Sequence, residues 1–331
     1  MTFTMFCLPA SKSEGRVLRR ASRLGLVRLL IVVSFAASQA ATGHQSESSQ
    51  ATGPVTSGGY SIFHETMVDM TWPEVEKAAR EGAVVLMTTA VIEEHGPHMS
   101  CGIDTYLGTL MCKLTRRELE SRGIKAVIAP PFYWGINGGS HVFPGTFTVR
   151  PETMKALLQD MLASLKSMGF RDIFNINAHG DGQHIRAAIE AVVGAHKSLG
   201  LNVRYLMSEG EAKRAGITGS EPFFLVHKEP PWEAEPTQYL DLHAGAWETG
   251  AVAAFFPEAV DIIAARGLEP TKVTMQEIGE WVKDMKKVTP LGYLGDPARF
   301  NAPKAKKNVE DSCRMMAEAI AGILDARSKA K

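Results

Sequence analysis

Residues 83–87 read Ala-Val-Val-Leu-Met, and residues 93–104 read Glu-Glu-His-Gly-Pro-His-Met-Ser-Cys-Gly-Ile-Asp. The apolar run is short and continuous, a pattern that predicts a strand buried on both faces. Glycine and proline then interrupt regular structure, so the polar residues follow the carboxyl end of that strand. Ligands bind at this end of the strands in parallel α/β sheets. We therefore expect the functional site in residues 93–104.

The residue types in this segment are those of a metal site. Glu93 and His95 are two positions apart, so their side chains leave an extended backbone on the same face. A turn through Gly96 and Pro97 can bring Asp104 back to them. Carboxylate and imidazole ligands together suit zinc, manganese or iron(II). Taken alone, the segment could equally be a polar loop with hydrogen-bonded histidines.

Helical and strand patterns alternate through the rest of the chain. Thr71 and Glu74 form a capping-box pattern at the start of a helix before the first strand. Later helices are expected at 105–121, 152–168, 183–197 and 303–326, and later strands at 126–129, 172–177 and 203–207. This alternation, with short links, predicts an α/β fold with a largely parallel sheet and right-handed crossovers. Residues 208–238 lack a clear period.

The composition bounds the class of protein. The 331 residues are 45% hydrophobic and carry no formal net charge, which allows one large α/β domain or about two smaller ones. A neutral balance gives no electrostatic basis for binding nucleic acid. No segment after residue 41 is apolar over the roughly 18 residues that a membrane-spanning helix needs. Cys101, Cys112 and Cys313 form no disulfide framework, although one pair remains possible.

Residues 1–41 have the features of an export signal. Five arginines precede the apolar run 29–37, and small residues follow at 38–41, as in a basic region, a hydrophobic region and a cleavage site. The pair Arg19-Arg20 fits a twin-arginine signal loosely. A basic amphipathic helix is the alternative, and an uncleaved signal would act as a membrane anchor. We expect cleavage, a flexible linker at 42–59 and a periplasmic or secreted domain at 60–331 without membrane contact.

Further polar or aromatic segments follow predicted strands or precede a predicted helix. The loop 134–146 is long and rich in glycine, which favours a substrate-facing loop over a solvated connector. The segments 178–182, 229–233 and 239–250 also concentrate chemically useful side chains. A parallel sheet can bring such segments to one edge. Their candidate site residues are Ser140, His141, His179, Asp181, Trp232, His243, Trp247 and Glu248.

Taken in order, these blocks resemble the signature of the creatininase (creatinine amidohydrolase) family. The resemblance spans about residues 65–325, and its first and third blocks are the most specific. The blocks are Glu93-x-His95-Gly96-Pro97-His98 with Asp104, His141-x-Phe143-Pro144-Gly145-Thr146, Asn177-x-His179-Gly180, and Asp241-x-His243-Ala244-Gly245-x-x-Glu248-Thr249.

The resemblance implies a three-layer α/β/α sandwich with two divalent metal ions, zinc paired with zinc, manganese or iron, and often a hexameric homo-oligomer. Carried over by position, Glu93 and His179 bind one metal, His95 and Asp181 bind the other, and Asp104 bridges them. The chain departs from the family pattern at Asp181, where many relatives have no carboxylate and the creatinine-hydrolysing branch has glutamate. It departs again at 99–101 and at Gly250, so the substrate stays open.

The resemblance also implies an activity, the cleavage of an amide-like C–N bond. We expect His243 to be the general acid, because imidazole titrates in the useful range. Glu248 would orient His243 or bind substrate, and His98 would hold a metal ligand by a hydrogen bond. The expected function is an exported hydrolase acting on a cyclic amide, a formamide or a similar small-molecule amide. A metal-dependent peptidase of the same family and a non-catalytic binding protein are the alternatives.

The remaining candidate residues are expected to contact substrate or to support the fold. The expected substrate contacts come from the glycine-rich loop and the two tryptophan-bearing segments: Ser140, His141, Trp232 and Trp247. Four other histidines, isolated from the polar blocks or placed in a helical first turn, are expected to be structural or on the surface: His64, His184, His196 and His227.

Overall fold

Five parallel strands form the middle layer of the computed structural model, which describes residues 61–329. The strands are β1 (Val84–Thr89), β2 (Ala126–Ile128), β3 (Asp172–Asn177), β4 (Asn202–Ser208) and β5 (Phe224–His227). Their order across the sheet is β2-β1-β3-β4-β5, and every neighbouring pair is parallel. The predicted parallel sheet is confirmed. The predicted export signal and linker, at 1–41 and 42–59, lie outside the described residues.

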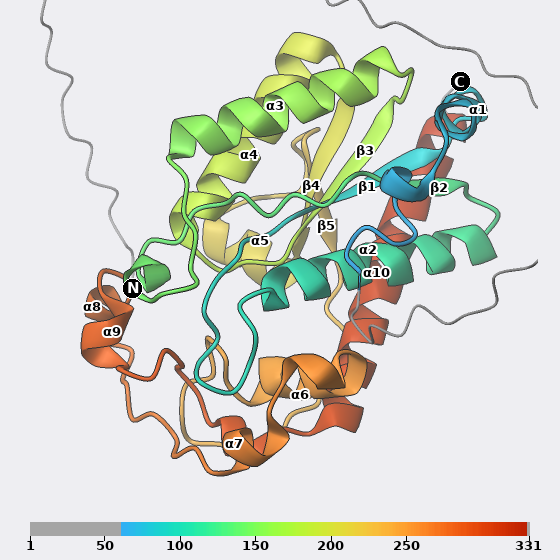
Figure 1. Ribbon diagram of the computed structural model, residues 1–331. Helices are drawn as coiled ribbons and strands as arrows, with labels where there is room; N and C mark the ends of the chain where they lie inside the picture. The colour runs from blue at the N-terminus through green and yellow to red at the C-terminus, as the bar shows by residue number, and fades with distance from the viewer. Residues whose placement is uncertain (1–60, 330–331) are drawn as a thin grey trace, which may run out of the picture. The chain divides into compact units, whose positions relative to one another are not determined.

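Helices cover both faces of this sheet, which gives the predicted α/β/α sandwich (Figure 1). One face carries α1 (Trp72–Arg80), α3 (Pro151–Ser167) and α4 (Gly182–Leu199), and the other carries α2 (Ile103–Ser121) and α10 (Ala302–Lys329). β1 is buried on both sides, as its unbroken apolar run predicts. Its side chains alternate between the two layers. Val85 and Met87 join one hydrophobic cluster, whereas Val84 and Leu86 join the other.

The three helices on the first face begin with side-chain caps or prolines that the sequence places there. At α1, the backbone N–H of Thr71 donates to Glu74 Oε2 at 2.7 Å, which completes the predicted capping box. α3 has a proline in its first turn, where the missing N–H has no helical partner. α4 begins at Asp181, whose side chain accepts the N–H groups of Gln183 and His184. Because α4 follows β3 directly, this cap fixes the loop at the carboxyl end of that strand.

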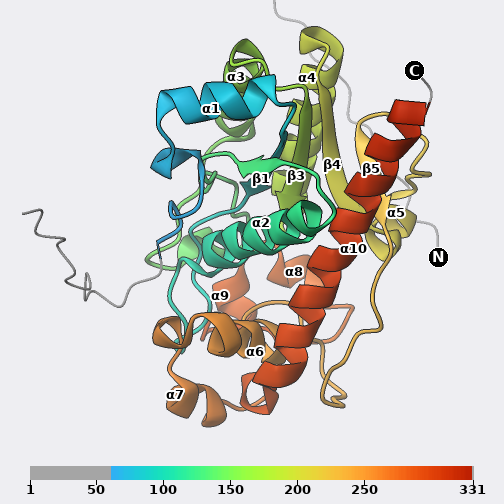
Figure 2. The ribbon, with the colours of Figure 1, turned by 90° about the vertical axis from the view of Figure 1, so that its right-hand side faces the viewer.

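Short helices gather at one end of the sheet, beyond the α2 and α10 layer (Figure 2). They are α6 (Ala246–Phe255), α7 (Ile262–Arg266), α8 (Ile278–Trp281) and α9 (Met285–Val288). The sequence patterns missed most of these because helices of one or two turns show little period, and they missed α5 (Glu209–Ala215) and β5 because residues 208–238 lack a clear period. Four 3₁₀ turns complete the fold: η1 (Met67–Asp69), η2 (Ser140–Val142), η3 (Pro257–Ala259) and η4 (Pro297–Arg299).

None of the helices within residues 61–329 combines the length and apolar character needed to cross a lipid bilayer.

Gly108 allows α2 to lie against the ends of β1 and β3, and its replacement is expected to destabilise the fold. A Cβ at this position would lie 2.3 Å from Thr88 Oγ1 and 2.9 Å from Ala178 Cβ. We expect Gly108→Ala to lower the free energy of unfolding by about 1–3 kcal/mol through overpacking. Urea unfolding measures the change. Gly322→Ala in α10 is the matched control, because nothing lies within 4 Å of its Cβ. It should raise stability by roughly 0.5–1 kcal/mol. A shift of the same sign in both variants would refute this account of α2 packing.

Candidate metal centre

The loop after β1 carries the first two site residues and turns the chain back into α2. The backbone N–H of Glu93 donates to the carbonyl of Cys101 at 2.9 Å, and His95 forms an antiparallel bridge with Met99. Gly96 has φ 67°, and a Cβ there would lie 2.9 Å from His98 Nδ1. Glycine is therefore required at this turn. The turn places Asp104 in the first turn of α2, facing the loop that precedes it.

The other members of the site come from two more loops. His179 follows β3, which pairs with β1 so that Thr89 lies opposite Asn177. The two strands therefore end side by side, and their loops meet. His243 and Glu248 come from the segment that leads into α6. The backbone of His243 pairs with Leu294, with N–H to O distances of 3.1 and 2.8 Å, which holds this irregular segment in place.

Two groups of ligand atoms share the carboxylate of Asp104. In the first group, His179 Nδ1 lies 2.8 Å from Asp104 Oδ2 and 3.2 Å from Glu93 Oε2. In the second group, His95 Nε2 lies 3.2 Å from Asp104 Oδ1 and 3.9 Å from Glu248 Oε2. Within each group all three ligand atoms lie within 4.8 Å of one another, close enough to surround one cation. We call these five residues the metal cluster.

Hydrogen bonds on the far side of each imidazole fix its tautomer. His95 Nδ1 donates to the carbonyl of Glu93 at 3.0 Å, and His179 Nε2 donates to the carbonyl of Ile136 at 3.1 Å. When neutral, each ring therefore presents an unprotonated nitrogen to the carboxylates. A backbone acceptor behind the ring is the usual arrangement for a histidine that binds metal.

The cluster has a strong preference for positive charge. Burial by itself raises the pKa of Glu93, but the charges of His179 and His243 outweigh burial and hold this pKa at about 2. Burial would likewise lower the pKa of His95, but Asp104, Glu248 and Glu93 raise it to about 10. The same balance keeps the pKa of Asp104 well below its usual range and that of His179 well above. Protons or metal cations can meet this demand.

Two buried atoms at the centre of the cluster favour metal cations over protons. His95 Nε2 and Asp104 Oδ2 have no hydrogen bond of acceptable geometry, although each lies close to oppositely charged atoms. Buried polar atoms in native proteins are normally paired. A cation is bound by ligand atoms that point toward one place and do not form hydrogen bonds to one another. Their chemistry, imidazole nitrogen with carboxylate oxygen, suits zinc and manganese, so these residues fit the expected metal ions.

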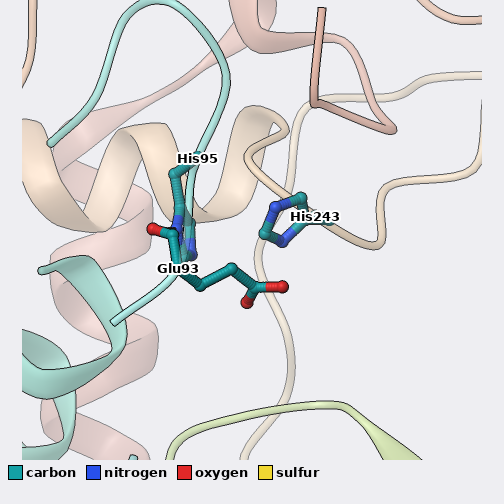
Figure 3. Close-up of side chains that lie close together, drawn as sticks. All are labelled: Glu93, His95 and His243. Carbon is teal, nitrogen blue, oxygen red and sulfur yellow. Dashed lines mark hydrogen bonds between the residues drawn. The ribbon is translucent and has the colours of Figure 1, made fainter. Parts of the chain in front are cut away.

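His243 closes one side of the cluster, and Glu93, His95 and His243 form a third candidate group. The ring centroids of His95 and His243 are 4.5 Å apart. Figure 3 shows the ring of His243 and the carboxylate of Glu93 pointing toward one another. His243 Nε2 donates to the carbonyl of Glu94 at 2.9 Å. Nδ1 is therefore the ring nitrogen that remains for proton exchange at the site.

Asp181 differs from its expected position, because it lies outside all three candidate groups of the described residues. Its Oδ1 accepts the N–H groups of Gln183 at 2.8 Å and His184 at 3.0 Å, and its Oδ2 accepts the N–H of Gly138 at 3.0 Å. Both oxygens are thus used by the backbone at the start of α4. Glu248, expected to be catalytic, instead lies beside His95 as the third carboxylate of the cluster.

The remaining predicted residues lie around the cluster at different depths. Ser140 is buried and donates from Oγ to Glu93 Oε1, so it holds a candidate ligand. His141 is exposed and contacts the carbonyl of Gly138. His98 Nε2 lies 2.9 Å from Thr249 Oγ1, which ties the first loop to α6 through a neighbour of Glu248.

The two tryptophans expected to contact substrate form a pair outside the metal cluster. The ring centroids of Trp232 and Trp247 are 5.5 Å apart. Both line a cavity of about 380 Å³ between the 232–237 segment, α6 and the start of α10. Asp241 and Arg299 also line this cavity, which contains no member of the cluster. The structure therefore associates Trp247 with the cluster only through its sequence neighbour Glu248.

Sequence patterns did not assign a site role to three residues that contact the cluster or His243. His184, expected to be structural, packs edge-on against His179 with centroids 5.0 Å apart, and burial lowers its pKa to about 3. Trp281 of α8 lies 6.3 Å from His243 between ring centroids. The carboxylate of Glu94 approaches the same histidine. Only Glu94 had a signal, since it lies between two predicted ligands.

Comparison with known proteins agrees with these blocks. A family model described as creatinine amidohydrolase matches residues 68–320. Creatinine amidohydrolase from Pseudomonas putida is 27% identical over 78% of this chain and 94% of its own length. Mycofactocin precursor peptide peptidase from Mycobacterium ulcerans (strain Agy99) is 25% identical over 72% of this chain and 80% of its own.

Solved structures of creatininase share the fold. A crystal structure of creatinine amidohydrolase has a TM-score of 0.61 at 22% identity, covering 78% of this chain and 97% of that one. A structure described as creatininase Mn has a TM-score of 0.60 at 22% identity, covering 77% and 97%. A mutant creatininase of the Zn-Zn type has a TM-score of 0.58 at 22% identity, covering 79% and 98%.

The ordered sequence blocks, the parallel sheet and the match across residues 68–320 establish that this chain belongs to the creatininase family.

Proposed function

We propose that this chain is a binuclear metal-dependent amidohydrolase that hydrolyses a C–N bond of a cyclic amide, a formamide or a similar small amide. The observation that carries the proposal is the sharing of Asp104 by two groups of ligand atoms, one with Glu93 and His179 and the other with His95 and Glu248. One carboxylate between two histidines from different strands suits a pair of cations better than a single cation.

Charge balance supports two divalent ions. Glu93, Asp104 and Glu248 contribute three carboxylates to a site in which burial makes uncompensated charge costly. Neutral imidazoles from His95 and His179 do not offset them. Bound divalent cations lower the pKa of a coordinated water and polarise a carbonyl group, which is the chemistry that amide hydrolysis needs. Zinc and manganese both suit these ligands.

The protein's own groups would orient the substrate and move the proton. His243 is fixed at Nε2 by the carbonyl of Glu94, so Nδ1 would accept the proton that the attacking water loses and pass it to the leaving nitrogen. Ser140 would keep Glu93 in its ligating rotamer. The cluster is largely enclosed, since the side chains of Glu93, His95, Asp104 and His179 are at most 6% exposed and that of Glu248 is 18% exposed. Such enclosure favours a small substrate over a long peptide.

The geometry of the site also bears on the two alternatives, a non-catalytic metal-binding protein and a peptidase. A non-catalytic metal-binding protein would not need a proton donor, and His243 is held at the cluster with one ring nitrogen left for that role. A peptidase would use the same metals, and a relative from Mycobacterium ulcerans is a precursor peptide peptidase. The enclosure of the cluster argues against a peptidase. A substrate screen separates a peptidase from an amidohydrolase that acts on small amides.

Export belongs to the proposal on sequence grounds alone. The basic, apolar and small-residue regions within residues 1–41 support a cleaved signal and a periplasmic or secreted enzyme. Amino-terminal sequencing of the protein from a native cell fraction would decide between cleavage and a retained anchor.

Metal removal should abolish hydrolysis. The purified domain, screened against creatinine, formamides, lactams and short peptides, is expected to hydrolyse a small amide and to contain about two metal ions per chain. Chelation should remove the two ions and abolish the activity, and adding zinc or manganese should restore metal content and activity. Elemental analysis measures the metal content, and a product assay measures the activity. Activity that survives complete removal of metal would refute the mechanism, whereas cleavage of peptides alone would favour the peptidase.

Asp104→Asn should lower occupancy of both metal positions, because its two oxygens serve both groups. Asp181→Asn is the control, because the structure uses both Asp181 oxygens for backbone N–H groups. It should keep about two metals per chain and lose about 1 kcal/mol of stability, because the amide oxygen still caps α4 but the amide NH₂ cannot accept the N–H of Gly138. Metal analysis with thermal unfolding gives both readouts. Loss of metal in Asp181→Asn would instead make Asp181 a ligand.

His243→Gln should retain metal and lose turnover. The cluster keeps its five ligand residues, whereas the proton donor is absent, so kcat is expected to fall about 10²–10⁴-fold. Single-turnover kinetics on the metal-loaded variant measures the chemical step. A fall in kcat that metal analysis explains entirely by lost ions would show that His243 is a ligand and not the acid.

A further inference from the structure

Glu94 lies between two cluster residues in sequence and is held rigidly. Its backbone N–H donates to Thr146 Oγ1 at 3.0 Å, and its Oε2 accepts the N–H of Gly96 at 2.9 Å. The backbone at Gly292 passes directly against this carboxylate, since a Cβ there would lie 2.0 Å from Oε2. Gly292 also has φ 78°, which favours glycine for a second reason. The Glu94 side chain therefore has a single defined position.

The free oxygen of Glu94 faces His243. The carbonyl of Glu94 accepts the Nε2–H of His243 at 2.9 Å, and Oε1 of its side chain lies 3.5 Å from the same nitrogen. Oε1 is buried and has no hydrogen-bond partner among the described residues. Burying an unpaired carboxylate oxygen costs free energy. Packing alone gives no reason for a carboxylate here, because one oxygen suffices for Gly96.

Few other contacts fix the His243 ring. Leu294 pairs with the backbone of His243 and leaves the side-chain torsions free. His95 and Trp281 contact the faces of the ring, at centroid distances of 4.5 and 6.3 Å, and do not discriminate between its two nitrogens. The carboxylate of Glu93 also lies toward the ring, as a member of the third candidate group. Glu94 differs from it in presenting two acceptors, its carbonyl and Oε1, to Nε2.

We propose that Glu94 is a positioning residue that orients His243. Two acceptors of Glu94, its carbonyl and its Oε1, face one ring nitrogen, so that nitrogen must carry the hydrogen. The neutral ring is thereby held as the Nε2–H tautomer, and Nδ1 is presented to the metal cluster. This inference deepens the proposed function and rests on it, because it assigns the group that sets the proton donor's orientation.

The substitution Glu94→Gln distinguishes an orienting role of Glu94 from a role in packing alone. Its shape matches glutamate, but it has one acceptor oxygen. If that oxygen accepts the N–H of Gly96, the amide NH₂ faces His243 Nε2–H, donor against donor. If the amide turns round, Gly96 loses its partner. A residue needed only for packing would tolerate this change, whereas a residue that fixes the tautomer would not.

The first test is the tautomer itself, read from histidine side-chain ¹⁵N shifts in the metal-loaded full chain. Selective histidine labelling provides the spectra, and the signal lost in His243→Gln assigns the resonance. Wild type is expected to show Nε2–H alone for His243. Glu94→Gln keeps the backbone carbonyl but sets an amide N–H against Nε2–H, so it is expected to show a mixture of both tautomers. An unchanged Nε2–H tautomer in Glu94→Gln would overturn the proposal. This readout needs no substrate, so it stands even if no hydrolysis is found and the proposed function fails.

The second test is kinetic, on the amide that the substrate screen identifies. Glu94→Gln is expected to lower kcat about 10–100-fold, as does removal of a group that orients an active-site ligand. KM should stay within about twofold, because substrate binding is not altered. Metal content should match wild type. An unchanged kcat, or a loss that follows lost metal, would overturn the proposal.

Asp172→Asn is the matched control for removing a carboxylate from this fold. Asp172 begins β3, at the opposite end of the strand from His179, and its Oδ2 accepts a hydrogen bond from Arg327 at 2.8 Å. This variant is expected to unfold at lower urea concentration with kcat and the His243 tautomer unchanged. If Asp172→Asn reproduced the effect of Glu94→Gln, general destabilisation would explain both and the proposal would fall.

Discussion

The carboxylate of Asp104, shared between two histidines, is the contact on which the site depends. His95 comes from the loop after β1 and His179 from the loop after β3, and each lies within about one hydrogen-bond length of an Asp104 oxygen. The pairing of Thr89 with Asn177 sets where both loops begin. A shift of register by one residue would turn the loop residues to the other face of the sheet and separate them. The parallel sheet therefore acts as the alignment device for the metal cluster.

The second half of the cluster is supported differently. Glu248 and His243 come from a segment with no strand and only the start of α6. Its geometry depends on backbone hydrogen bonds to Leu294 and on Ala244, which has φ 49° and donates its N–H to Glu248. Left-handed backbone at a residue other than glycine is strained and concentrates at functional sites. The segment 243–248 is thus held by loop contacts and the start of α6, not by the sheet.

One half of the cluster is aligned by the sheet and the other is held at the start of α6. This difference explains which features of the fold and the site could be predicted from the sequence. β1, β3 and the long helices are long enough to display a period, so their place and the parallel sheet followed from the sequence, as did the meeting of Glu93, His95, Asp104 and His179. β5 and α5 lie within residues 208–238, where the sequence shows no clear period, so neither was predicted.

Side-chain roles were harder to predict than positions. Glu248 was expected to orient His243 or bind substrate, and Asp181 to bind metal. The structure places Glu248 beside His95 in the cluster and Asp181 at the start of α4. Both are carboxylates beside a helix start, and sequence alone does not reveal whether such a group faces inward or caps. The distinction has a physical cause. The Asp181 oxygens accept three backbone N–H groups that would otherwise be unpaired, whereas Glu248, one methylene longer and in the first turn of α6, reaches past its own backbone to His95. The three N–H groups around Asp181 favour the capping position, because moving its carboxylate toward the cluster would leave them without acceptors.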